Sequence, residues 1–145
     1  MKTHTKLRIL SVSIGVIFFY FGFLKLFPNA SPAENLGINT VSMLCFEILS
    51  RKACILALAL LEVSIGLSLI TGKFLKWGVI TAIAHLVMTF TPVFLFPDLV
   101  FADSPWTPSL LGQYIYKNIA LIGALIVLYP GGSPFDFKSR KMAKA

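Results

Sequence analysis

Long apolar stretches alternate with short polar segments along this chain, and their lengths are typical of membrane-spanning helices. A bilayer core of about 30 Å is crossed by about 20 helical residues. Four stretches meet this length, over residues 7–27, 53–70, 75–96 and 108–129. They predict an all-α fold, an integral membrane four-helix bundle that occupies residues 1–145 as a single domain.

Turn-forming residues mark the ends of these stretches. Thr71 and Gly72 follow the second stretch, where a glycine can end a helix in the left-handed conformation. Thr107 and Pro108 predict the N-cap and the first helical residue of the fourth stretch. Pro92 lies inside the third stretch, where it predicts a kink.

The segment between the first two stretches has a helical pattern of its own. Ser31 and Glu34 have the spacing of a capping box, in which each side chain bonds the other residue's backbone N–H. Apolar residues then recur at near-helical spacing, at Leu36, Val41, Leu44 and Ile48. This pattern predicts a short amphipathic helix over 32–49, which lies either at the membrane surface or across the end of the bundle.

The distribution of basic residues predicts the orientation. One side of the membrane would hold Lys2, Lys6, Arg8, Lys73, Lys76, Lys138, Arg140, Lys141 and Lys144. The other side would hold only Arg51 and Lys52. Because cytoplasmic loops carry the excess of Lys and Arg, both termini are expected in the cytoplasm. The basic tail over 131–145 is expected to contact anionic lipid headgroups.

Composition agrees with a membrane protein and excludes several other classes. The chain is 57% hydrophobic and 13% charged, and its net charge is +7. The basic residues lie at the tails and between the spans, so the lipid bilayer is the expected partner and nucleic acid is not. The first stretch is longer than the apolar core of a secretory signal and has no small-x-small cleavage site, so we interpret it as a retained span. No zinc-binding spacing occurs, and no metal site is predicted.

Each of the four spans carries one of four ionisable residues away from its cytoplasmic end: Lys25, Glu62, His85 and Lys117. A charge within hydrocarbon is costly, so it is expected to be paired, hydrated or functional. Counted along the helices, Glu62 and Lys117 would both lie about 13 Å from the outer ends of their spans, and His85 about 16 Å. We therefore expect Glu62 and Lys117 to neutralise each other, with His85 bonded to either. Lys25 is close to the outer end of its span and is expected to extend towards the surface.

Asn118 and Thr89 add hydrogen-bonding groups near these residues in the sequence. Two interpretations of the polar residues stay open. They form a functional site or pathway, as ionisable groups at this depth often do. Alternatively, they are a structural clasp that holds the helices together, since polar contacts between helices contribute modestly to bundle stability.

Two cysteines, Cys45 and Cys54, fall on the outer side, where thiols can oxidise. They form no Cys-x-x-Cys motif, which gives no support for a thioredoxin-type centre. A disulfide between them and two small buried apolar side chains are both open interpretations.

Three short motifs resemble those of the DoxX family, small bacterial membrane proteins with four spans. They are Gly22-Phe23-Leu24-Lys25-Leu26-Phe27, Glu62 followed by Gly66, and Gln113-Tyr114-Ile115-Tyr116-Lys117-Asn118 followed by Leu121-Ile122-Gly123. The resemblance covers nearly the whole chain. It implies an association with membrane redox systems, including a subunit of a thiosulfate:quinone oxidoreductase. Lys25, Glu62, Lys117 and Asn118 are the site residues that it carries over.

Three function classes follow from these observations. The leading hypothesis is a subunit or accessory of a quinone- or thiol-linked redox system, with quinone as the ligand and a soluble or membrane oxidoreductase as the partner. The second is a proton-coupled transporter or channel, for which four spans would require a homo-oligomer. The third is a structural or assembly protein without an activity of its own. The sequence leaves open whether the chain is itself an enzyme.

Overall fold

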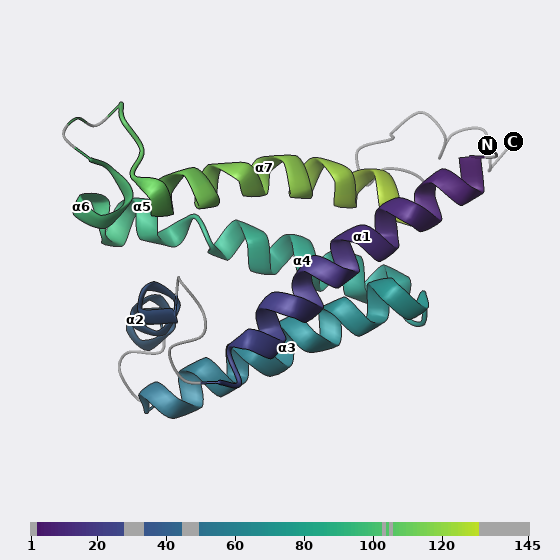
Figure 1. Cartoon of the computed structure of the whole chain (residues 1–145), viewed down its shortest axis with the longest axis horizontal. Coiled ribbons are helices and arrows are strands. Elements are labelled where there is room, and N and C mark those ends of the chain that lie inside the picture. Colours follow the sequence, from purple (N-terminus) through teal and green to yellow (C-terminus); the bar gives the residue numbers. More distant parts are fainter. Residues whose placement is uncertain (1–2, 28–33, 45–49, 103, 105, 131–145) are drawn as a thin grey trace, which may run out of the picture.

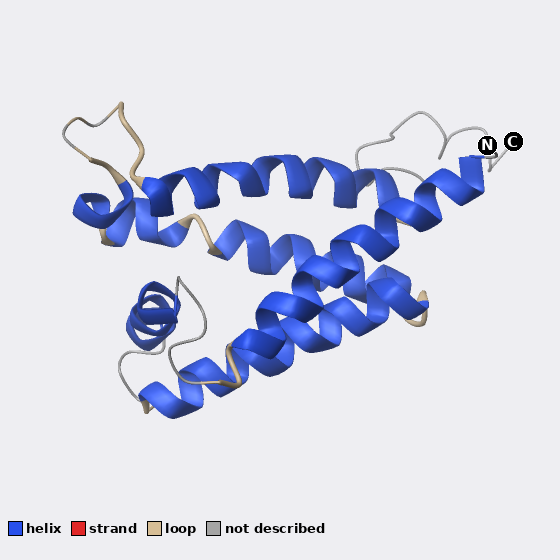
Figure 2. Ribbon diagram, viewed as in Figure 1, coloured by secondary structure: helices blue, strands red, loops and turns tan. Residues whose placement is uncertain are grey.

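The computed structural model describes residues 3–27, 34–44, 50–102, 104 and 106–130. These residues form seven helices and one isolated β-bridge (Figure 2). Four helical segments are long and apolar enough to cross a membrane: α1 (Thr3–Leu24), α3 (Arg51–Thr71), α4 with α5 (Leu75–Leu95), and α7 (Leu110–Leu128). The predicted all-helical architecture with four apolar helices is thus confirmed, and it indicates a multi-pass membrane protein.

The four long segments run alternately up and down (Figure 1). Helices α1 and α3 cross in close contact, and α4 lies between α3 and α7. Helix α1 begins and α7 ends at the same end of the bundle, which we call the terminal end; the opposite end is the loop end. The main apolar core consists of Ile14, Phe18, Ile65, Leu69, Val79, Ala82, Leu86, Leu125 and Leu128.

Glycines allow α1 and α3 to approach backbone to backbone. A Cβ atom on Gly66 of α3 would lie 2.5 Å from the backbone nitrogen of Phe19 in α1. A Cβ atom on Gly15 of α1 would lie 2.9 Å from the carbonyl oxygen of Gly66. Small residues permit this spacing, which is a common way for membrane helices to associate. The pair is also hydrogen-bonded, because the Ser11 hydroxyl donates to the Leu69 carbonyl oxygen over 2.8 Å.

Two of the predicted helix interruptions, at Gly72 and at Pro92, are confirmed. Gly72 ends α3 in the left-handed conformation, with φ of 76°, and its N–H donates to the Ser68 carbonyl oxygen. The third span breaks after Met88, where α4 (Leu75–Met88) gives way to α5 (Thr91–Leu95). Pro92 accounts for the break, because it has no N–H to donate to the Met88 carbonyl and its ring crowds that group.

The predicted start of the fourth span is wrong by two residues. The N-cap of α7 is Ser109, whose hydroxyl accepts from the Gly112 N–H, and not Thr107. Pro108 lies before the helix, where it forms the isolated bridge with Phe101. The Ser109 N–H donates to the Val100 carbonyl oxygen, so the chain stays extended up to Ser109 and the helix starts only afterwards.

The helix between the first two spans closes the loop end of the bundle. Helix α2 (Glu34–Leu44) is shorter than the predicted 32–49 and is seen end-on in Figure 1, across the direction of the spans. Its Leu36 packs with Val100 of α6 (Pro97–Val100) and with Ile115 of α7. Helix α2 therefore packs across the end of the bundle, one of its two predicted positions. Ser31 of the predicted capping box and the tail 131–145 lie outside the described residues.

Enlarging Gly66 should weaken the bundle, whereas enlarging Gly123 should not. A Cβ on Gly66 would overlap the backbone of α1, so we expect Gly66→Ala to cost about 1–3 kcal/mol of unfolding free energy. A Cβ on Gly123 of α7 meets nothing within 4 Å, and alanine there should be neutral or stabilising by up to about 1 kcal/mol. Unfolding of both variants in detergent measures the difference, and equal effects would contradict the close packing of α1 on α3.

Candidate functional site

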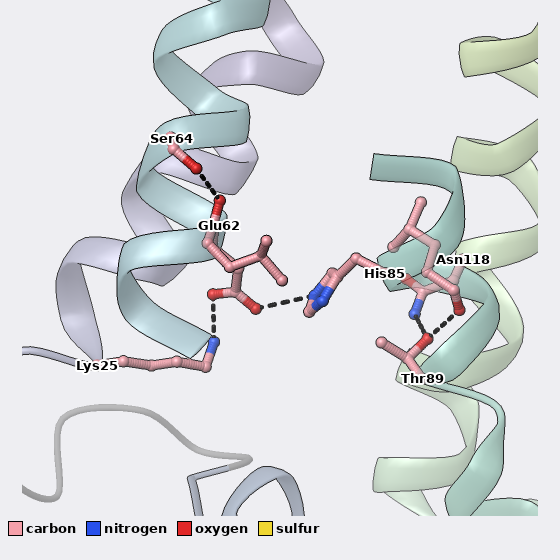
Figure 3. Close-up of polar contacts among 8 residues, drawn as sticks. Lys25, Glu62, Ser64, His85, Thr89 and Asn118 are labelled. Carbon is pink, nitrogen blue, oxygen red and sulfur yellow. Dashed lines mark hydrogen bonds and ion pairs between the residues drawn. The ribbon is translucent and has the colours of Figure 1, made fainter. Parts of the chain in front are cut away.

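Three side chains meet in what we call the Glu62 cluster: Lys25, just after α1, Glu62 of α3 and His85 of α4. The Lys25 ammonium donates to Oε2 of Glu62 over 2.6 Å. Nε2 of His85 lies 3.1 Å from the other carboxylate oxygen, Oε1. Figure 3 shows the two groups approaching the carboxylate from different sides. The side chains of the cluster are only 9–11% exposed, so each of these contacts is largely shielded from solvent.

The close approach of α1 to α3 places Lys25 at Glu62. A Cβ on Gly22 would lie 2.8 Å from the Glu62 Cβ, so α1 touches α3 at the level of the carboxylate. Helix α1 ends at Leu24, and Lys25 follows in a turn. Helix α3 continues beyond the level of Glu62 towards the loop end for about 16 Å. The Lys25 ammonium therefore lies beside the middle of α3 and not at its end.

The predicted ion pair between Glu62 and Lys117 is wrong, because Lys25 is the partner of Glu62. The expectation that Lys25 extends towards the surface is wrong for the same reason. Both predictions assumed that the spans end at the same level, whereas α1 stops short of the loop end of α3. His85 is expected to bond either Glu62 or Lys117, and it bonds Glu62.

Lys117 and Asn118 are neighbours in α7 with separate environments. The Asn118 amide donates to the Thr89 hydroxyl over 2.8 Å, and Thr89 in turn donates to the Leu86 carbonyl oxygen (Figure 3). Successive residues of a helix point about 100° apart, so with Asn118 turned towards α4, Lys117 faces outward. The Lys117 side chain is exposed, and its ammonium lies 5.3 Å from the ring centroid of Tyr114. Neither residue belongs to the Glu62 cluster.

His85 is held so that its two ring nitrogens have different roles. An ionised carboxylate can only accept a hydrogen bond, so Nε2 carries the proton that binds Glu62. Within the described residues Nδ1 has no hydrogen bond, whereas every buried side-chain nitrogen or oxygen there has a hydrogen-bond partner. Nδ1 therefore reaches the accessible surface, where it can take up a proton or accept a bond from a ligand.

Phe18 is a member of the site that the sequence did not indicate. Its ring meets the His85 imidazole edge to face, with centroids 5.9 Å apart and planes at 62°. The residue is 5% exposed and lies on the face of α1 that also carries Gly15 and Gly22. That spacing of small residues is the signal that could have identified the face of α1 towards α3.

The described residues contain no group of three or more His, Cys, Asp or Glu side chains placed to hold a metal ion. Cys54 is completely buried near the start of α3. Cys45 lies outside the described residues, so a disulfide between the two stays a prediction.

Comparisons with protein-family models, curated proteins and solved structures find no match to this chain. The resemblance to the DoxX family thus stays a prediction that rests on the three sequence motifs.

Removing the Lys25 charge should destabilise the protein far more than removing the Lys117 charge. Breaking a buried ion pair leaves an uncompensated charge, so Lys25→Met should cost about 3–5 kcal/mol, and Glu62→Gln in the same chain should restore part of it. Lys117→Met is the matched control and should cost under about 1 kcal/mol. Unfolding of the single and double variants gives the coupling energy, and a coupling of zero would contradict the pairing of Lys25 with Glu62.

The protonation of His85 can be observed directly, because the chain has only two histidines. In protein labelled with ¹⁵N-histidine, we expect the neutral His85 ring to be protonated at Nε2, since the Glu62 carboxylate accepts there. His4, near the start of α1, provides the internal reference. Glu62→Ala should allow both tautomers. A neutral His85 protonated at Nδ1 in the wild type would contradict the arrangement.

Proposed function

We propose that this chain is a DoxX-like subunit of a quinone-linked redox system in the bacterial cytoplasmic membrane. In this proposal, both termini lie in the cytoplasm, as the excess of basic residues at the terminal end suggests. The Glu62 cluster is then a proton-exchanging site for a quinone headgroup. The observation that carries the proposal is the Glu62 carboxylate held between a cation, Lys25, and a titratable group, His85.

The position of the cluster supports a ligand that moves within the membrane. Glu62 is the twelfth residue of α3, about 16 Å from the loop end of that helix. An ionisable cluster at this depth is costly to keep unless it serves a pathway or a site. A quinone has an apolar tail and a headgroup with two carbonyl oxygens, so it can reach this depth and needs hydrogen-bond donors there.

The bonding of His85 supports proton exchange. With His85 neutral, the charges of Lys25 and Glu62 cancel, and the cluster carries no net charge. A proton taken up at Nδ1 makes the ring cationic beside the carboxylate, and the proton on Nε2 can then pass to Glu62. The Lys25 ammonium holds the carboxylate in its orientation between these events.

Quinone reduction consumes two electrons and two protons. Under the proposal the protons pass through His85 and Glu62, while the electrons come from a partner oxidoreductase that docks on this subunit. The chain would thus position the quinone and supply protons, and the redox centre would belong to the partner.

The break in the third span favours proton-coupled transport as a second candidate. Interrupted helices often form the binding sites of transporters. The break at Thr89 and Phe90 lies one helical turn from His85, and its Thr89 hydroxyl bonds to Asn118. Proton uptake into liposomes that contain the wild-type protein alone, and its loss in Glu62→Gln, would support this candidate over the first.

Quinone binding tests the proposal. Purified protein should contain quinone by solvent extraction, or bind a short-chain quinone by calorimetry. Glu62→Gln and His85→Gln should weaken binding by about tenfold or more, because a lost hydrogen bond to a charged group costs about 1.5–3 kcal/mol. Lys76→Met, which removes an exposed lysine of α4 at the terminal end, is the control and should bind normally.

The same variants separate a site from a structural clasp. If Glu62→Gln and His85→Gln lower the unfolding temperature but leave quinone binding unchanged, the cluster is a clasp and the proposal is wrong. It is also wrong if the wild-type protein binds no quinone and membranes that lack it reduce quinone at the normal rate.

A further inference from the structure

Lys117 places a positive charge on the outer surface of the bundle within a membrane span. It is the eighth residue of α7, about 10 Å from the loop end of that helix. Figure 1 shows α7 along one edge of the bundle. Only 17% of its most apolar stretch is buried, against 28–33% for the other three spans. Helix α7 therefore has the smallest buried share of the four.

The exposed side of α7 near Lys117 combines polar and small residues. We call it the Lys117 face, made of Gln113, Lys117, Ala120 and Gly123. All four are exposed, and their spacing of three or four residues puts them on one side of the helix. A Cβ on Gly123 would meet nothing within 4 Å, so the surface there is open. Small residues beside a polar one are typical of membrane-helix interfaces, where backbones approach closely.

Among the described residues, the contacts of Lys117 do not compensate its charge. A lysine at the centre of a membrane helix costs about 2.5–3.5 kcal/mol. The centroid of the Tyr114 ring lies 5.3 Å from the ammonium, and this cation–π contact offsets about 0.5–2 kcal/mol of that cost. Within the described residues no carboxylate contacts Lys117, and the nearest polar neighbour along the helix, Asn118, is bonded to Thr89. The remaining charge calls for an anionic group from beyond the described residues.

We propose that the Lys117 face binds a transmembrane helix of a different membrane protein, one that carries an aspartate or glutamate level with Lys117. A second copy of this chain does not meet that requirement. Glu62 is the only carboxylate in the four described spans, and both of its oxygens are already bonded, to Lys25 and His85. The inference goes beyond the proposed function and does not depend on the Glu62 cluster.

Association with a defined helix tests the charge requirement. The probe is a synthetic 22-residue Leu/Ala transmembrane peptide with one glutamate about 10 Å from one end, and an otherwise identical peptide with glutamine. Energy transfer between labelled protein and labelled peptide in liposomes measures binding. We expect the glutamate peptide to bind at least fivefold more tightly. Lys117→Met should abolish that preference, and Lys76→Met should retain it. Equal binding of the two peptides to the wild type would overturn the proposal.

Crosslinking in native membranes tests the occupant. A photoreactive amino acid at Ala120 should crosslink to a helix of another membrane protein that has a carboxylate within one turn of the crosslinked residue. Lys117→Met, and neutralisation of that carboxylate, should each remove the crosslink, while Lys76→Met should not. Crosslinking to a second copy of this chain, to a helix without a carboxylate, or to lipid alone would overturn the proposal. None of these outcomes depends on quinone binding, so the two proposals can fail separately.

Discussion

The ion pair between Lys25 and Glu62 ties the end of α1 to the middle of α3, and much of the bundle is arranged around it. Neither charge is tolerable alone at this position, because an isolated ion within the apolar interior costs several kcal/mol. The pair needs the two backbones close together, which Gly15, Gly22 and Gly66 allow. Through His85 the same carboxylate also bonds α4, so it links the α1–α3 pair to the third span.

The early end of α1 shapes the loop end of the molecule. Because α1 stops at the level of Glu62, the outer part of α3 has no neighbouring span on that side, and α2 occupies the space. Leu36 of α2 packs against Val100 of α6 and Ile115 of α7. The polar cluster is thus bounded by α2 towards the loop end and by the main apolar core towards the terminal end.

Much of the fold could be predicted because hydrophobic length and turn residues are local signals. The four spans, the left-handed cap at Gly72 and the break caused by Pro92 all depend on a few neighbouring residues. The pairing of charges could not be predicted in this way. Counting residues from the span ends put Lys117 level with Glu62, but depth does not determine which side of a helix faces its neighbour. The environment of Lys117 depends on the rotation of α7, and that of Lys25 on where α1 ends. Both are properties of packing between helices. Depth placed His85 near both Glu62 and Lys117, and the packing of α4 on α3 decides that Glu62 is its partner.

The order of the two charges along the chain has a consequence for biosynthesis. Lys25 is made before Glu62, and it lies just past the last turn of the first span. A lysine there can enter the membrane with its ammonium still hydrated at the headgroups. Glu62 follows near the centre of α3, where hydration is not available, and by then its counter-ion is already present in the nascent protein. Glu62, the charge that is most costly to bury, is thus synthesised only after Lys25, which neutralises it.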